Sequence, residues 1–232
     1  MIYYKCDEIM GKLIVIEGAC DGIGKSTQYG LLRDYLKKDY PDVNIVTHHF
    51  PSYNTEQGSC VEMYLNGKFG SPENLSPYFI NALYAVDRAV TWNLELKKTY
   101  DKDGVILLDR YTTSSLIYQT AFMKNEVDKK AFIDYVVDFE YNKLGIQKPD
   151  EVFFLYAPYD LVTKMRKERN TSTDIHENKD EYQKIFYENA LFIANYLNWT
   201  WIDCSMDNNM KSIESIHEEI KEKTEAVLGK NR

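Results

Sequence analysis

A glycine-rich stretch that ends in a lysine and two hydroxyl residues is the strongest chemical signal in this sequence. It follows the short apolar run 13–16 and leads into a segment with helical spacing. Glycines let the backbone turn tightly, so that N–H groups point at phosphate oxygens. The lysine would reach the β- and γ-phosphates of a nucleotide, and the serine hydroxyl would meet Mg²⁺. We expect a nucleotide-phosphate loop made of Asp21, Gly22, Ile23, Gly24, Lys25, Ser26 and Thr27.

This loop departs from the usual P-loop spacing by one residue. The pattern G-x-x-x-x-G-K-S requires glycine at position 19, where this chain has Ala19, and Gly18 lies one residue too early. We interpret the difference as a one-residue insertion that bulges outward and leaves the cradle from Asp21 onward intact. The alternative is an ordinary glycine-rich connection, but the preceding strand, the Gly-Lys-Ser run and the following helix favour phosphate binding.

A second pair of chemically active residues follows the apolar run 105–108. Asp109 could hold Mg²⁺ or its waters, so that Ser26 and Asp109 are the candidate metal ligands. Arg110 could clamp a phosphate group. Taken alone, the pair could equally be a surface ion pair at a strand end. Its position after a strand of the same sheet as the phosphate loop favours a functional role.

Short apolar runs alternate with amphipathic segments along the chain. Uniformly apolar strands are covered on both faces, which indicates a parallel sheet between two helical layers. We therefore predict a single α/β domain, residues 1–232, of the three-layer P-loop NTPase type with a parallel five-stranded sheet. Ligands bind at the carboxyl ends of such strands. The expected strands are 13–16, 43–49, 105–108, 151–156 and 199–202, and the expected helices are 25–36, 75–100, 129–143, 160–169, 180–197 and 210–228.

Composition excludes several other classes of protein. The chain has 232 residues, 44% hydrophobic and 28% charged, which is typical of a folded protein. The net charge of −8 argues against a protein that coats a nucleic acid polymer. Apolar stretches are too short for a membrane span, and the first ten residues lack the apolar region of a signal peptide. The four cysteines form no C-x-x-C pair, so we expect no zinc site and a cytoplasmic location.

The order of these motifs resembles that of the thymidylate kinases, P-loop nucleoside monophosphate kinases that phosphorylate dTMP. The resemblance implies an enzyme of pyrimidine deoxynucleotide biosynthesis that uses ATP and Mg²⁺, binds no membrane and forms a homodimer. It covers most of the chain. The motifs are Glu17-Gly18, the stretch from Asp21 to Gln28, Phe50-Pro51, the stretch from Tyr84 to Arg88, Asp109-Arg110-Tyr111, Ser114-Ser115, Tyr118-Gln119 and Lys148-Pro149-Asp150.

The resemblance also implies roles for individual residues. Asp21 would accept a hydrogen bond from the sugar 3′-hydroxyl, and Arg110 would hold the acceptor phosphate. Tyr84 would stack on thymine while Arg88 donates to a thymine carbonyl, because residues four apart share a helix face. Tyr84 could instead be core, and Asp21 a turn residue. The remaining expected substrate contacts are Phe50, Tyr53, Tyr118 and Gln119. Tyr118 could also be plain core. Tyr53 stands where many thymidylate kinases have an arginine.

A basic run after the fourth strand resembles the mobile LID of that family, at about residues 164–178. Arg166 and Arg169 are three residues apart and would share a helix face. We expect at least one of them to meet the negative charge of the transferring phosphoryl group when the LID closes. A solvated helix face is the alternative. The expected catalytic residues are thus Lys25, Arg110, Arg166 and Arg169.

Two other functions use similar motifs. A deoxynucleoside kinase also pairs a P-loop with an arginine after a later strand, but typically has Glu-Arg-Ser where this chain has Asp109-Arg110-Tyr111. A non-catalytic P-loop scaffold would bind a nucleotide without transferring phosphate. A guanine-nucleotide switch would need Asn-Lys-x-Asp, and the run Asn142-Lys143-Leu144-Gly145 stops short of it.

Overall fold

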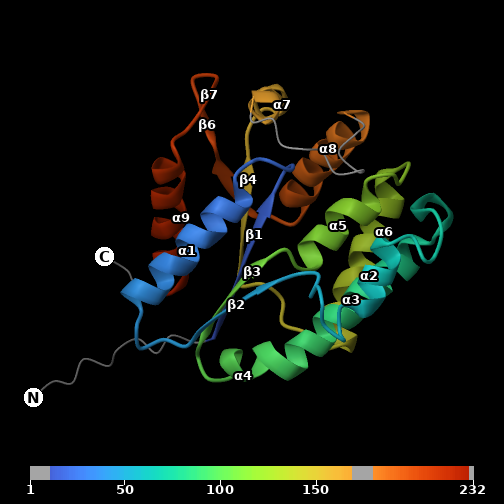
Figure 1. Ribbon diagram of the computed structural model, residues 1–232, viewed down its shortest axis with the longest axis horizontal. Coiled ribbons are helices and arrows are strands. Elements are labelled where there is room, and N and C mark those ends of the chain that lie inside the picture. The colour runs from blue at the N-terminus through green and yellow to red at the C-terminus, as the bar shows by residue number, and fades with distance from the viewer. Residues whose placement is uncertain (1–10, 169–179, 230–232) are drawn as a thin grey trace, which may run out of the picture.

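The computed structural model describes residues 11–168 and 180–229 (Figure 1). At its centre lies a parallel five-stranded sheet in the order β2-β3-β1-β4-β5, which confirms the predicted fold class. Because β1 lies between β3 and β4, the loop after β1 is next to the residues that follow both neighbouring strands. The strands are β1 (Lys12–Gly18), β2 (Ile45–His49), β3 (Val105–Asp109), β4 (Glu151–Tyr156) and β5 (Thr200–Asp203).

The central strands are apolar because both of their faces are covered. Leu13 and Val15 pack into a core on one face of the sheet, and Ile14 and Ile16 pack into a second core on the other. All four side chains are fully buried. This alternation is the two-residue period of a strand, and it explains why the sequence shows a continuous apolar run instead of a polar face.

Helices cover both faces of the sheet (Figure 1). The core on the Ile14 side contains residues of α1 and α9, and the core on the Leu13 side contains residues of α5, α6 and α8. The helices are α1 (Lys25–Asp39), α2 (Ser59–Leu65), α3 (Pro77–Thr91), α4 (Lys97–Tyr100), α5 (Thr112–Thr120), α6 (Glu126–Val137), α7 (Tyr159–Glu168), α8 (Asp180–Tyr196) and α9 (Ile213–Val227). In the described parts of the chain, no helix is both long and apolar enough to cross a membrane.

Two predicted helices continue into wider π-helical turns. The helix predicted at 75–100 begins at Pro77, where the Ser76 side chain accepts from the N–H of Tyr78 at 3.3 Å, and passes through η2 (Trp92–Leu96) into α4. The helix predicted at 129–143 begins earlier, at Glu126, and ends in η3 (Asp138–Lys143). Short elements without a strong apolar period escaped prediction: α2, α5, the 3₁₀ turn η1 (Pro72–Asn74) and the hairpin of β6 (Ser205–Met206) and β7 (Asn209–Met210).

Candidate active site

The glycine-rich loop leaves β1 and remains packed against the sheet for two further residues. The N–H of Ala19 donates to the carbonyl of Leu155 at 2.9 Å, and the Ala19 side chain is only 2% exposed. Cys20 is half-buried. Ala19 is therefore held against the sheet, while β1 has already ended at Gly18 and the chain bends at Ala19 and Cys20. Gly18 is required here, since a Cβ atom would lie 2.8 Å from Cγ2 of Ile23.

The second half of the loop forms the N-terminus of α1. Gly22 and Gly24 have φ angles of 85° and 101°, which only glycine adopts without strain. Gly24 is the N-cap residue, and Lys25 begins the helix. Ser26 and Thr27 are exposed in its first turn. The unpaired N–H groups and the dipole of a helix N-terminus attract phosphate, so this geometry suits the predicted phosphate loop.

Lys25 lies against the residue that ends β3. Its Nζ atom forms an ion pair with Oδ1 of Asp109, and both side chains are largely buried. On the other side, Nδ1 of His49 lies 3.1 Å from Oδ2 of Asp109. Burial alone would raise the pKa of the Asp109 carboxyl, but the hydrogen bond from His49 and the charge of Lys25 lower it to about 2. Asp109 is therefore ionised at neutral pH.

Sheet register explains this assembly. Asp109 is the partner of Ile16 in β1 and of His49 in β2, so three strand ends meet at one point. The sequence predicted that Asp109 follows a strand of the same sheet as the phosphate loop, and the structure places Asp109 against Lys25 of that loop. His49 was not predicted, although a polar residue at the end of the second strand was the signal that could have found it.

Arg110 adopts a left-handed backbone conformation, with a φ of 67°. This conformation is uncommon for a residue with a side chain, and such residues are frequent at functional sites. Its Nη2 atom lies 3.5 Å from Oδ1 of Asp21, and Nη1 donates to the hydroxyl of Tyr118 at 3.2 Å. Burial alone would lower the pKa of Arg110, but oxygens of Tyr118 and Glu17 outweigh it and raise the pKa. The structure thus brings Arg110, Asp21 and Tyr118 together.

Glu17 is a buried carboxylate beneath the site, and its motif in the sequence predicted no role for it. It is 1% exposed and accepts hydrogen bonds from Thr113 Oγ1 at 3.0 Å and Ser114 Oγ at 2.5 Å. Its other oxygen accepts from the N–H of Gly18 at 3.1 Å. Glu17 therefore joins the phosphate loop to the start of α5. Its position directly before Gly18 was the available signal.

The loop after β2 is anchored on α3. The N–H of Ser52 donates to Oδ2 of Asp87 at 2.8 Å, and both residues are buried. Tyr53 follows and is 49% exposed, with its ring stacked on His49 at 6.1 Å. Phe50 is 2% exposed and lies in the core. Of the two residues predicted here, Tyr53 therefore presents an exposed ring, whereas Phe50 is buried in the core.

Tyr84, on α3, is half-buried beside α2, with its ring edge-to-face against Tyr64 at 6.2 Å. Burial raises the pKa of its hydroxyl, so Tyr84 is neutral at physiological pH. Arg88, four residues later, is 1% exposed and forms an ion pair with Glu140 at 2.7 Å. Gln119 on α5 has a buried side-chain oxygen that accepts no hydrogen bond from the described residues. An orphaned acceptor of this kind costs stability unless a ligand donates to it.

The predicted LID falls largely outside the described residues. Arg166 belongs to α7, which follows β4. Arg169 and the rest of the segment to residue 178 lie outside the described part of the chain.

The residues predicted to hold Mg²⁺ offer suitable oxygen atoms. Ser26 is exposed at the start of α1, and the Asp109 carboxylate is ionised. Within residues 11–168 and 180–229, no group of three or more His, Cys, Asp or Glu could hold a metal ion. Mg²⁺ binds oxygen through one or two protein groups together with substrate phosphates. Ser26 and Asp109 fit that mode, and an all-protein metal centre does not fit the described residues.

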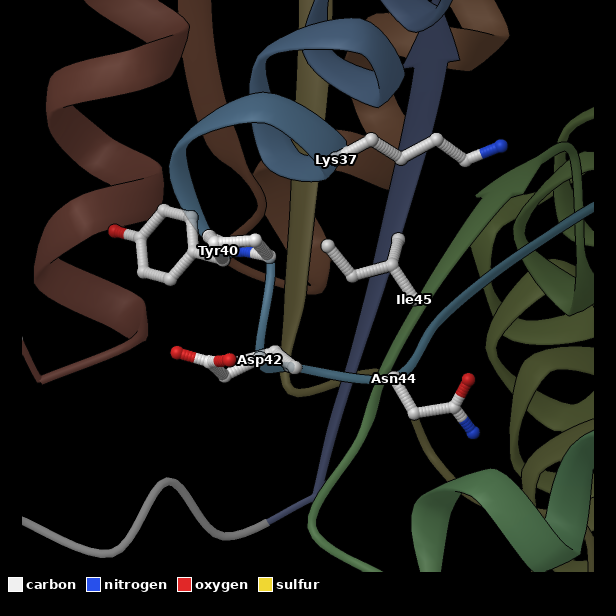
Figure 2. Close-up of a pocket in the computed structure, with 7 residues that line it drawn as sticks. Lys37, Tyr40, Asp42, Asn44 and Ile45 are labelled. Atoms are coloured by element: carbon white, nitrogen blue, oxygen red, sulfur yellow. The ribbon is translucent and has the colours of Figure 1, made fainter.

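A surface hollow of about 420 Å³ lies elsewhere on the molecule (Figure 2). It opens where α1 ends and β2 begins, whereas Asp109 lies beside the last residue of β2, at the opposite end of the sheet. Among the described residues that line it, Lys37 is the only cation. Its described lining includes no glycine-rich loop that could cradle a phosphate, so we do not assign it to the nucleotide chemistry. Its lining is Lys37, Tyr40, Pro41, Asp42, Val43, Asn44 and Ile45.

Comparisons with known proteins agree with this geometry. A family model described as thymidylate kinase matches residues 16–220. The thymidylate kinase of Plasmodium falciparum is 30% identical over 92% of this chain and 90% of its own length. A probable thymidylate kinase of Thermococcus kodakarensis is 30% identical over 93% and 98%. The structure of the Candida albicans thymidylate kinase matches with a TM-score of 0.69 and 24% identity, covering 94% of each chain, which supports the fold.

Proposed function

Because this chain belongs to the thymidylate kinase family, we propose that it transfers the γ-phosphoryl group of ATP to dTMP, giving ADP and dTDP. One observation carries the proposal: a phosphate loop, an ionised aspartate and an arginine meet at the carboxyl ends of β1 and β3. The deoxynucleoside kinase alternative is not favoured, since the relatives described above are thymidylate kinases.

On the donor side, the N–H groups at the start of α1 hold the phosphates of ATP. Lys25 exchanges its contact with Asp109 for the β- and γ-phosphates. Ser26 and Asp109 hold Mg²⁺, which, when bound, neutralises charge on the transferring phosphoryl group. Phosphoryl transfer asks the protein for positioning and charge neutralisation, and these groups supply both.

On the acceptor side, Arg110 holds the dTMP phosphate and Asp21 accepts from the sugar 3′-hydroxyl. The 3.5 Å ion pair between them supports this division, because it places the cation and the carboxylate side by side. Tyr53 adds a neutral hydrogen bond to the phosphate, and Phe50 shapes the loop. Tyr118 lines the sugar pocket, since its hydroxyl already contacts Arg110.

For the base, Tyr84 stacks on thymine and Gln119 accepts from the thymine N3–H through its orphaned oxygen. Arg88 donates to the O4 carbonyl. Its Nε atom donates to Glu140, and its Nη2 atom donates to both Glu140 and Ser115. Nη1 takes part in none of these bonds and is the nitrogen that would meet the base. A site built to hydrogen-bond one base rejects bases that leave its groups unpaired.

The LID, at about residues 164–178, delivers Arg166 or Arg169 to the phosphoryl group. An arginine supplied in this way stabilises charge that develops chiefly in the transition state. Lys25 is the only cationic side chain in the phosphate loop, because Asp21 is followed by Gly22 and Ile23 and not by a basic residue. The whole chain thus acts as one kinase domain.

The protein works as a homodimer in the cytoplasm. Along α3 and η2, Phe79, Val86, Val90 and Leu94 are 39%, 50%, 37% and 73% exposed. Their spacing of seven and four residues places them on one helix face. A second copy that packs against this face would remove its apolar surface from water.

The test is an assay of ADP release with Mg-ATP and either dTMP or thymidine. We expect release with dTMP and little with thymidine. Release with thymidine alone would indicate a deoxynucleoside kinase, and release with neither would indicate a non-catalytic nucleotide-binding protein.

A further inference from the structure

A completely buried ion pair lies beside the proposed base pocket. Arg88 of α3 and Glu140 of η3 are 1% and 0% exposed. Their contact is bidentate: Nε donates to Oε2 and Nη2 to Oε1, each at 2.7 Å. This fork is the strongest hydrogen-bonded geometry available to an arginine and a carboxylate, and it fixes the plane of the guanidinium group.

Glu140 has no bonding capacity left for a ligand. Besides Arg88, its Oε1 accepts from Asn81 Nδ2 at 3.2 Å and its Oε2 accepts from Thr112 Oγ1 at 3.1 Å. Two bonds at each oxygen use the acceptor sites of a carboxylate. Glu140 therefore acts on other side chains and does not contact a substrate itself.

The same carboxylate connects the two walls of the proposed base pocket. Asn81 and Arg88 belong to α3, which carries Tyr84, and Thr112 belongs to α5, which carries Gln119. Nη2 of Arg88 also donates to Ser115 at 3.0 Å. Gln119 is four residues beyond Ser115 on the same helix, so the anchored end of Arg88 faces the turn that presents the orphaned amide oxygen.

A local departure from α-helical geometry places Glu140. The residue lies in the π-helical turn η3, where Leu144 N–H bonds the carbonyl of Phe139. A π-turn accommodates one extra residue and rotates the side chains that follow, and such turns are frequent at functional sites. A well-packed apolar pair would stabilise this core as well or better, so stability alone does not account for two buried charges.

We propose that Glu140 is the positioning residue for base selection: it locks Arg88 so that Nη1 meets a 4-carbonyl and rejects a 4-amino group. The inference rests on the proposed function. Thymine offers an acceptor at position 4, whereas cytosine offers a donor, which would face another donor across a water-poor pocket. Because Arg88 is held in place, its Nη1 donor cannot turn away from the 4-amino group of cytosine. Both donors are then left without an acceptor.

The experiment compares kcat/KM for dTMP and dCMP in the native enzyme and in Glu140→Gln. The glutamine amide presents an N–H₂ donor to Arg88, so one of the two hydrogen bonds that fix the guanidinium group is lost. We expect the dTMP to dCMP ratio to fall at least about tenfold, with the KM for ATP nearly unchanged. Ile220→Ala, in the core on the other face of the sheet, is the matched control, because it lowers stability without touching this network. Its ratio should stay native despite a lower Tm.

An unchanged ratio in Glu140→Gln would make Glu140 a purely structural residue and overturn the inference. If that variant does not fold, the double variant Arg88→Met/Glu140→Met removes both charges together, which buried pairs tolerate. It should fold and lose the preference, and a native ratio in it would also overturn the inference. A native enzyme that uses neither dTMP nor dCMP would instead refute the proposed function.

Discussion

Arg110 is expected to carry most of the acceptor-phosphate binding, because the position that is arginine in many thymidylate kinases is Tyr53 here. The test replaces Arg110 by Met, which removes the guanidinium but keeps an unbranched stem and the same left-handed backbone. Tyr53→Phe is the matched control, since it removes one hydroxyl from the neighbouring loop. Both variants leave the phosphate loop of α1 intact.

The magnitudes follow from the chemistry of the two groups. A hydrogen bond to a charged group contributes about 1.5–3 kcal/mol, and a guanidinium can make two such bonds to one phosphate. The Arg110 side chain is 24% exposed, so water screens its charge and the lower value of about 1.5 kcal/mol applies to each bond. The two bonds together then contribute about 3 kcal/mol. That corresponds to about a 100-fold loss of kcat/KM. A neutral tyrosine bond contributes about 0.5–1.5 kcal/mol, or about two- to tenfold.

The assay is steady-state kcat/KM for dTMP at saturating Mg-ATP, with the KM for ATP as an internal check on the donor side. Arg110→Met should lose about 100-fold and Tyr53→Phe only a few-fold. A severe loss in Tyr53→Phe together with a mild loss in Arg110→Met would reverse the assignment of the two residues.

Three further outcomes are expected. Arg166→Ala/Arg169→Ala should lower kcat by orders of magnitude while dTMP affinity is nearly kept; a kcat within a few-fold of native would leave only a solvated helix face. The pKa of Asp109 is lowered to about 2, so its ionised form stabilises the fold above pH 4 and this contribution is lost as the pH falls toward 2. In urea unfolding, the free energy of unfolding of Asp109→Asn should therefore fall about 2 kcal/mol less between pH 4 and pH 2 than that of the native protein. An identical pH profile in the two proteins would contradict the ion-pair assignment. In analytical ultracentrifugation, Val90→Glu/Leu94→Glu should convert a dimer into a monomer, and a dimer of unchanged affinity would place the interface elsewhere.

Much of the site could be predicted because its chemistry is local in the sequence. The run from Gly22 to Thr27 carries its own backbone geometry, and a parallel sheet must bring the ends of neighbouring strands together. These two facts were enough to predict that Lys25 and Asp109 belong to loops at the same edge of the sheet. The path of the inserted length could not be predicted, because Ala19 is held against the sheet by a hydrogen bond to Leu155, far along the chain.

The remaining features depend on contacts that leave no local pattern. Glu140 pairs with Arg88 across 52 residues, and its orientation depends on a π-turn that has the same apolar spacing as an ordinary helix end. His49 reaches Asp109 only because the register of β2 against β3 makes them partners. Neither register nor helix type follows from residue spacing alone, so these residues emerge only from the folded chain.

The most direct test of the account follows the transferred group itself. The protein is incubated with Mg-ATP labelled at the γ-phosphate and with unlabelled dTMP, and the products are separated. The account predicts label in dTDP, and a loss of that product by orders of magnitude in Lys25→Ala. Label found only in inorganic phosphate, or native label transfer by Lys25→Ala, would contradict it.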